Sequence, residues 1–505
     1  MDHPEAGPER TPHDDQDSLE TAPSSGRLRD PGSRTLALLS WLGILGVVGF
    51  IVLSQYLVSG AAPAEVSEEP SPTAGIYMLM SRYTVGAVEL SKSAPGGEQQ
   101  ADDLKAQLLG QLESMTVTRD QRLRLALLGI DLDQPELVEA QLELASAPPE
   151  NVNDSDDAGE AGEAAAVDIT IPEYVFDDAQ RIRDLQRGGV DALNAEDVAA
   201  LRDHHGWFAE IALTTGLDPD DPARAAAVSA ATRVMAALLA LAILGIAGVV
   251  VGCVLLIVLI IRFVSGKSHM RYAPPSPGGS VYLETFAIFL IAFLGTQVLA
   301  ETIFMLTGWD FGSALRWLLL LVLLWPLYRG APRNQVKFAL GWHRGEGVVK
   351  EIGAGFVGYL AGLPIVGLGV LLTFILSTVV ALFTQGPSAP PSHPIVQEVS
   401  NSSLLNVISL YLLASVWAPL VEESMFRGAL FHHLRGSMRA LFAALLSGFI
   451  FAIIHPQGIV LVPPLMCLGF NFAMIREWRG SIIGPMFAHA MHNAVLVTVL
   501  IIAMG

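Results

Sequence analysis

Three apolar segments toward the C-terminal end of the chain carry carboxylate, guanidinium, imidazole and amide groups, the side chains that acid–base chemistry uses. They are Glu422, Glu423 and Arg427 in the first segment, His455 in the second, and His489 and Asn493 in the third. A charged side chain is costly inside a bilayer, and one that is kept there usually has a function. We therefore expect the three segments to meet at an active site.

The spacing within each segment indicates how these groups cooperate. Glu423 and Arg427 are four positions apart, so on a helix they face one another and the guanidinium can neutralise and orient the carboxylate. Glu422 lies about 100° around the helix and can point elsewhere. His489 and Asn493 have the same spacing and present an imidazole and an amide on one face, a pair of donors suited to a developing oxyanion.

Each part of this pattern also has a purely structural interpretation. Glu423 and Arg427 can form an intramembrane ion pair, and His455 can end a helix at the outer membrane edge. His489 and Asn493 can hydrogen-bond between helices. The combination favours an active site, because one bundle seldom needs so many polar groups on three helices for packing alone.

Other polar residues in the apolar segments have simpler explanations. His492 lies three positions after His489 and faces partly elsewhere, so we expect it to pack against a neighbouring helix. His432 and His433 fall at a predicted membrane boundary, where we expect them to touch lipid headgroups. Glu284 and Glu301 lie near the two ends of one span and can reach the interfaces.

The composition indicates a membrane protein. Hydrophobic residues make up 51% of the 505 residues, and the chain is too apolar for a soluble protein. The net charge of -20 is concentrated in residues 61–230, which hold 33 of the 50 acidic residues but 11 of the 30 basic ones. This acidity indicates a well-solvated insert and argues against nucleic acid as a partner. Cys253 and Cys467 lie in apolar runs and cannot supply a disulfide framework.

The apolar runs predict an all-α fold, a polytopic transmembrane helix bundle of about nine spans with an acidic helical extracytoplasmic insert. We expect the spans at residues 36–58, 234–261, 284–306, 313–328, 352–383, 403–424 with helix continuing to about 434, 439–456, 459–475 and 481–503. Pro463 and Pro464 predict a kink or break in the eighth span.

The same pattern divides the chain into five regions. They are a disordered cytoplasmic tail at 1–34, an uncleaved anchor at 35–58, the insert at 59–232 with a linker near 147–166, a transmembrane helix and cytoplasmic loop at 233–283, and a membrane bundle at 284–505. Leucine periodicity predicts helical hairpins in the insert, and Asn194 followed by Glu196 and Asp197 predicts a helix start. The insert is either a simple helical domain or a module that binds a protein partner.

Basic residues set the expected orientation. Arg and Lys concentrate in loops at 262–271, 329–350, 435–439 and 476–479, which alternate with loops poor in basic residues. By the positive-inside rule these loops and the N-terminus are cytoplasmic, whereas the insert and the loop at 385–403 lie outside. We expect an integral, multi-pass protein of the plasma (inner) membrane of a prokaryote.

The ordered motifs resemble those of a known family, the CPBP family of CAAX-processing and bacteriocin-processing intramembrane proteases. The motifs are Glu422-Glu423-x-x-x-Arg427, Phe451-x-x-x-His455 and His489-x-x-x-Asn493. The resemblance covers roughly residues 284–503. It implies that Glu422 and His455 activate a water and that Glu423 and Arg427 support them. It also implies that His489 and Asn493, the histidine and asparagine of the third motif, hold the oxyanion.

The sequence lacks the motifs of other classes of intramembrane protease. The chain has no His-Glu-x-x-His for zinc and no Gly-x-Ser-Gly around a nucleophile, and Asp310 sits in a short outer loop. Glu422, His455 and His489 are chemically able to ligate zinc. A carboxylate in an apolar site can also activate water directly, so no cofactor is required and zinc stays the alternative.

These observations predict an intramembrane endopeptidase that cleaves a membrane-associated protein or peptide. The resemblance extends the substrate class to CAAX-type or lipidated proteins, and the lipid bilayer is the other expected partner. A catalytically silent membrane scaffold or immunity-type binding protein of the same fold is the main alternative, and a transporter with a proton-relay carboxylate is the third. A scaffold has no need to keep all six polar groups.

The expected orientation can be tested with reporter fusions. An alkaline phosphatase fused after residue 150 is expected to be active, because this part of the chain lies outside the cytoplasm. A fusion near residue 340 is expected to be inactive, because that loop is basic and stays inside. Activity of both fusions, or of neither, would reject the nine-span arrangement.

Overall fold

The computed structural model describes residues 31–60, 74–93, 97–148, 171–383, 404–455 and 457–504, which form helices and short connections without a β-strand. The predicted all-α class is confirmed. Most of the tail predicted at 1–34, most of the linker near 147–166 and the outer loop at 385–403 lie outside the described residues.

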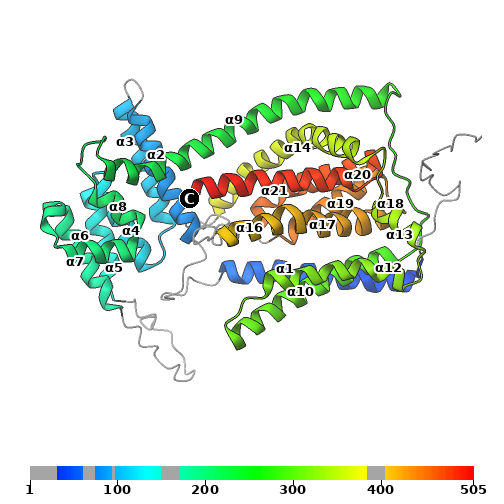
Figure 1. Ribbon diagram of the computed structural model, residues 1–505, viewed down its shortest axis with the longest axis horizontal. Helices are drawn as coiled ribbons and strands as arrows, with labels where there is room; N and C mark the ends of the chain where they lie inside the picture. The colour runs from blue at the N-terminus through cyan, green and yellow to red at the C-terminus, as the bar shows by residue number, and fades with distance from the viewer. Residues whose placement is uncertain are drawn as a thin grey trace, which may run out of the picture.

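The insert forms a helical domain at one end of the molecule (Figure 1). It consists of α2 (Ala74–Lys92), α3 (Gly97–Ser114), α4 (Arg119–Asp131), α5 (Pro135–Ser146), α6 (Glu173–Gly188), α7 (Ala195–His205) and α8 (Trp207–Leu213). Most of its periodic leucines face inward, as Leu123 and Leu142 show in one shared core, whereas Leu144 is exposed. Asn194 begins α7 as predicted, because its side chain accepts hydrogen bonds from the backbone N–H groups of Glu196 and Asp197.

One continuous helix joins the insert to the apolar helices. α9 (Pro222–Val264) has 43 residues and is therefore about 65 Å long. Its first turns lie in the insert core, where Trp207 Nε1 donates to the Ala227 carbonyl at 2.8 Å. Farther along, α9 packs against α14 (Val348–Phe383). The boundary predicted at 232 thus falls inside a helix, and the two parts of the protein share this rigid element.

Among the residues that the structure describes, six helices are long and apolar enough to cross a membrane. They are α1 (Arg34–Gly60), α9, α10 (Val281–Thr307), α14, the helix Leu404–Arg435 and α21 (Ile483–Met504). The other three predicted spans correspond to the apolar segment Gly312–Tyr328, to α19 (Ala440–Ile453) and to α20 (Val462–Arg479). A polytopic helical bundle is confirmed, and the number of nine spans stays a prediction.

The basic loops predicted to be cytoplasmic lie together at the end of the bundle opposite the insert (Figure 1). Backbone hydrogen bonds join Arg271 to Trp478, across two of these loops, and Ile482, just after the last of them, to Gly341. Arg479, at the end of α20, also pairs with the Glu351 carboxylate at 2.9 Å. This arrangement agrees with one common side for the four loops, whereas the identity of that side stays a prediction.

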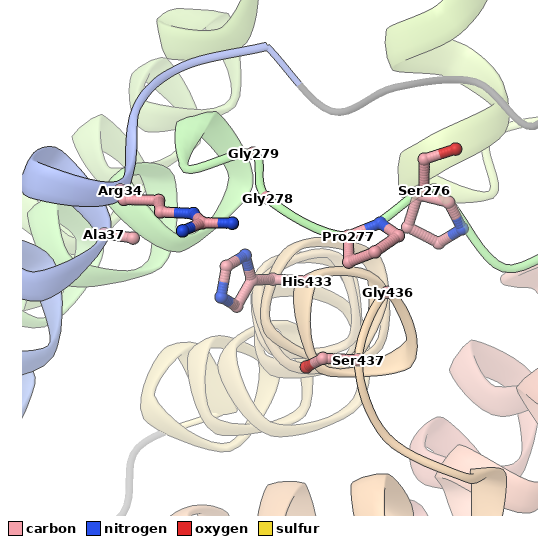
Figure 2. Close-up of a pocket in the computed structure, with 10 residues that line it drawn as sticks. Arg34, Ala37, Ser276, Pro277, Gly278, Gly279, His433, Gly436 and Ser437 are labelled. Carbon is pink, nitrogen blue, oxygen red and sulfur yellow. The ribbon is translucent and has the colours of Figure 1, made fainter.

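A pocket of about 180 Å³ opens at the same end, between the start of α1 and α18 (Phe431–Arg435). Figure 2 shows Arg34 and His433 facing each other across it. The neighbouring His432 is 6% exposed, and the Tyr272 hydroxyl lies 2.6 Å from its Nδ1. The prediction that His432 touches lipid headgroups is therefore wrong, because the loop before α10 folds over it.

The prolines of the eighth predicted span begin a helix and do not interrupt one. Pro463 and Pro464 lie in the first turn of α20, where backbone N–H groups have no intrahelical acceptor. A residue without an N–H is therefore tolerated at this position. The kink or break predicted at the prolines is wrong, because the prediction assumed an α-helix that had already begun before them, whereas α20 begins at Val462.

Glycines let α21 approach α14 closely. A Cβ atom on Gly355 would lie 2.4 Å from the Gly484 carbonyl oxygen, so a side chain does not fit at this crossing. Gly353, two residues away on the same helix, has nothing within 4 Å of an added Cβ. The crossing fixes the start of α21, the helix that carries His489 and Asn493.

Gly355→Ala is expected to destabilise the folded protein by about 1–3 kcal/mol, because the added methyl group overpacks the crossing. Gly353→Ala is the matched control and is expected to be neutral or to stabilise by up to about 1 kcal/mol through helix propensity. Thermal unfolding of the purified variants in detergent measures the difference. Equal unfolding temperatures would show that the crossing is not closely packed.

Candidate active site

The helix that carries both glutamates contains two π-helical segments. It runs through α16 (Leu404–Leu412), the π segment Leu413–Trp417, α17 (Ala418–Glu423), the π segment Ser424–Leu430 and α18. In the first π segment the Ala418 N–H bonds to the Leu413 carbonyl, and the next residue, Pro419, has no N–H. The Ala414 carbonyl thus loses its usual helical donor. Asn493 Nδ2 donates to it at 2.7 Å and ties α21 to this helix.

Glu423 lies at the centre of a buried network of charged groups. Its Oε1 accepts a hydrogen bond from Arg427 Nη1 at 3.0 Å, as the four-residue spacing predicted, and lies 2.9 Å from His489 Nδ1. The side chains of Glu423 and Arg427 are 0% exposed. Removing one partner of a buried ion pair leaves an uncompensated charge, so the two groups are stable only together.

Three aromatic rings enclose the Arg427 guanidinium. Its Cζ lies 4.7 Å from the ring centre of Phe451, 5.2 Å from that of Phe472 and 5.7 Å from that of Phe426. Its Nη2 donates to the Gly469 carbonyl at 2.9 Å. Cation–π contacts and this hydrogen bond replace part of the lost hydration. The guanidinium therefore joins the glutamate helix to both α19 and α20.

Glu422 is the more accessible member of the glutamate pair. Its side chain is 18% exposed, and its Oε2 lies 4.0 Å from His489 Nε2. His489 thus has one ring nitrogen toward each carboxylate, and its ring stacks on Phe472 at 5.1 Å between centroids. Arg427 pairs with Glu423, and no ion pair between Arg427 and Glu422 is found among the described residues.

His455 lies directly after α19 and reaches the network across the ring of Phe451. Its Nδ1 donates to the Phe451 carbonyl at 2.5 Å, so a neutral ring carries its lone pair on Nε2. The Phe451 ring centroid is 4.4 Å from that of His455 and 6.0 Å from that of His489. Gln55 of α1 donates its side-chain amide to the His455 carbonyl at 3.1 Å, which links the N-terminal anchor to the site.

The structure brings the six predicted residues together to different degrees. The two glutamates, Arg427 and His489 form one network of contacts. His455 lies beside this network, in contact with the ring of Phe451, which also contacts His489. Asn493 is bonded to the backbone of the first π segment. The sequence did not predict that backbone bond, nor that a carboxylate faces each nitrogen of His489, and the chemical roles of all six residues stay predictions.

Sequence reasoning missed the groups that hold the network in place. Phe472 and the Gly469 carbonyl come from α20, a helix with no predicted site residue, and Gln55 comes from the anchor. A Cβ atom on Gly469 would lie 2.9 Å from Gly448 Cα of α19, so these two helices touch through glycines. A glycine in an apolar helix was the one available signal, and it does not identify which side chain will bond to its carbonyl.

The predicted zinc ligands Glu422, His455 and His489 do not form a compact ligand group. Among the described residues, one set of three His, Cys, Asp or Glu side chains has all its ligand atoms within 4.8 Å of one another. That set is Asp178 with His204 and His205, and it lies in the insert.

Comparisons with known proteins found one family model and one curated relative that match part of the chain. Residues 404–495 match the model of a family described as type II CAAX prenyl endopeptidase Rce1-like. The chain is also 29% identical over 140 residues to the "Putative membrane peptidase YdiL" of Bacillus subtilis (strain 168), a match that covers 26% of this chain and 57% of the length of that relative. No solved structure was found to match the chain. The resemblance to the CPBP family is confirmed for the part of the chain that contains all six site residues.

The buried ion pair gives a prediction about stability. Arg427→Met is expected to lower the yield of folded protein, because loss of one partner from a buried pair costs about 3–5 kcal/mol. Combining it with Glu423→Gln removes both charges and is expected to restore much of the folded yield without restoring activity. Thermal unfolding and size-exclusion profiles in detergent measure both effects. An Arg427→Met protein as stable as the wild type would show that the pair does not hold the site together.

Proposed function

We propose that this protein is a membrane-embedded endopeptidase that hydrolyses a peptide bond in a membrane-associated protein. The observation that carries the proposal is the network in which two helices bring Glu422, Glu423, Arg427 and His489 into contact, with His455 beside it. The family-model match covers the same residues. Such a group of charges lowers stability inside an apolar bundle, and this favours a catalytic use.

In the proposed mechanism, Glu422 and His455 hold the attacking water. As the water oxygen bonds to the scissile carbonyl carbon, Glu422 takes up its proton, which then passes to the leaving amine. His455 accepts a hydrogen bond from the water at Nε2, because its Nδ1 is bound to a backbone carbonyl. The partial exposure of Glu422 gives water and substrate access to this carboxylate.

The third motif stabilises the oxyanion in this scheme. His489 Nδ1 faces Glu423, so donation from Nε2 to the oxyanion requires a proton on both ring nitrogens. Glu423 and Arg427 hold the ring in position, since the Glu423 carboxylate contacts both the Arg427 guanidinium and the His489 ring. Asn493 donates one amide N–H to the π-helical backbone, and we assign its second N–H to the same oxyanion.

We propose a CAAX-type or otherwise lipidated protein as the substrate class. The name of the matching family states that its members act on CAAX prenyl proteins, and this supports the proposal for residues 404–495. The apolar helices around the glutamates also favour a substrate that is already held in the bilayer. The chemistry of the site defines this class of substrate and not one particular protein.

We further propose that the insert lies outside the cytoplasm and next to the outer end of the site. Met78 and Leu79 of α2 pack against a small cluster made by Leu410 and Ala414 of the glutamate helix and Val497 of α21. A protein bound to the insert would therefore lie close to both helices. This arrangement follows if the N-terminus is cytoplasmic and the membrane is the plasma membrane of a prokaryote.

Cleavage assays with membrane-tethered, lipidated peptides test the proposal. Glu422→Gln and His455→Ala are each expected to lower the cleavage rate ~10²-fold or more, since acid–base groups typically contribute about 10²–10⁴-fold. Both variants are expected to fold normally, because neither change strands the buried ion pair. Glu301→Gln on α10 and His269→Ala in an exposed loop are matched controls and are expected to keep full activity.

The outcomes also separate the alternatives. Full activity of Glu422→Gln would contradict its role as the base. Cleavage that stops after dialysis against a strong chelator and returns with zinc, together with less bound zinc in Glu422→Gln and His455→Ala than in the wild type, would make Glu422 and His455 ligands of a metal. Peptide binding without cleavage by the wild-type protein would favour the scaffold or immunity-type function.

A further inference from the structure

A second cluster of ionisable groups lies in the insert, outside the membrane bundle. Asp178 of α6 meets His204 and His205 at the end of α7. His204 Nδ1 lies 2.6 Å and His205 Nε2 lies 3.1 Å from the same oxygen, Asp178 Oδ2. Three side chains of types that bind metals thus bring one possible ligand atom each to within 4.8 Å of the others.

The end of a helix builds this cluster. His204 and His205 are the last residues of α7, and Gly206, with φ 52°, turns the chain into α8. Adjacent residues on a helix point about 100° apart, so the two rings reach one oxygen only through different nitrogens. The side chains of Asp178 and His205 are 0% exposed, and that of His204 is 33% exposed. The cluster is therefore buried on one side and open to an ion from solvent on the other.

Charged neighbours hold the three side chains in place. Arg181 Nη1 donates to Asp178 Oδ1 at 2.7 Å, which leaves Oδ2 to the two imidazoles. The other ring nitrogen of His205, Nδ1, is buried without a hydrogen bond and lies 3.4 Å from Asp120 Oδ1. A histidine that binds a metal usually turns its second ring nitrogen toward a carboxylate. Asp120 places a carboxylate at this position next to His205.

We propose that Asp178, His204 and His205 bind one divalent transition-metal ion, and that zinc fits best. Two imidazole nitrogens and one carboxylate oxygen are donors that zinc takes, and three protein ligands leave a fourth position for water. Calcium and magnesium prefer sites made of oxygen ligands. The exposed edge of His204 places the fourth position toward solvent.

The ion would stabilise the insert and takes no part in the chemistry of the membrane site. It joins α6 to the end of α7, and α8 follows directly after Gly206. Trp207 of α8 in turn bonds to the Ala227 carbonyl of α9, the helix that continues into the bundle. The site is therefore placed to stiffen the connection between the insert and α9, whether or not the protein is a protease.

Zinc binding to the purified full-length protein tests the proposal. Chelator-stripped protein in detergent is expected to take up one zinc per chain by calorimetry and elemental analysis. At a free zinc concentration about 100 times Kd, the unfolding temperature of the insert is expected to rise by roughly 5–10 °C. His204→Ala is expected to weaken zinc binding about 100-fold or more, and His204→Cys, which supplies a new ligand, is expected to restore it.

Two matched controls define the outcomes. Asp177→Asn changes an exposed neighbour of Asp178 and is expected to bind zinc like the wild type. Glu422→Gln is also expected to bind it, which separates this site from any metal in the membrane. Equal zinc affinity of the wild type and His204→Ala would overturn the proposal. So would the absence of zinc binding by the wild type, and the cluster would then be only a hydrogen-bonded contact between α6 and α7.

Discussion

The contact of Glu423 with Arg427 and His489 is the interaction on which the candidate active site depends. A lone carboxylate or guanidinium in an apolar interior costs several kcal/mol, so these groups stay together once the helices pack. Glu422 is the next residue to Glu423, and its position is therefore fixed by the same contact. The rings around Arg427 belong to α19 and α20, which extends the constraint to two more helices. One buried charge pair thus sets the relative positions of four chain segments.

The backbone provides the approach distances that this network requires. A π-helical segment and Pro419 leave the Ala414 carbonyl without its usual donor, and the Asn493 amide takes that place. Gly448 and Gly469 let α19 and α20 touch, so the carbonyl of Gly469 can reach the guanidinium. π-helical segments often occur at functional sites, and here the physical reason is visible: the carbonyl they release becomes an anchor for another helix.

The membrane helices and the motif spacings could be predicted from the sequence, because bilayer thickness fixes the length of a span and helix geometry fixes the four-residue pairs. The bond of Arg427 to Glu423 and the start of α7 at Asn194 are such local features. The bond from Gln55 to His455 joins residues 400 positions apart and depends on how helices pack, which local patterns do not encode. The two errors, the proline kink and the exposed His432, have the same origin. Both were inferred from a local pattern. The effect of the prolines depends on where α20 begins, and the burial of His432 depends on which loop folds over it.

A single-turnover cleavage in water enriched in ¹⁸O tests the central claim most directly. In the proposed mechanism the water activated by Glu422 adds to the scissile carbonyl, so mass spectrometry should find one ¹⁸O in the new C-terminal carboxylate of the product and none in Glu422. Label in the Glu422 carboxylate would show that this side chain attacks the peptide itself through a covalent intermediate. Absence of any cleaved, labelled product with every membrane-tethered peptide tried would contradict the assignment of this buried network to hydrolysis.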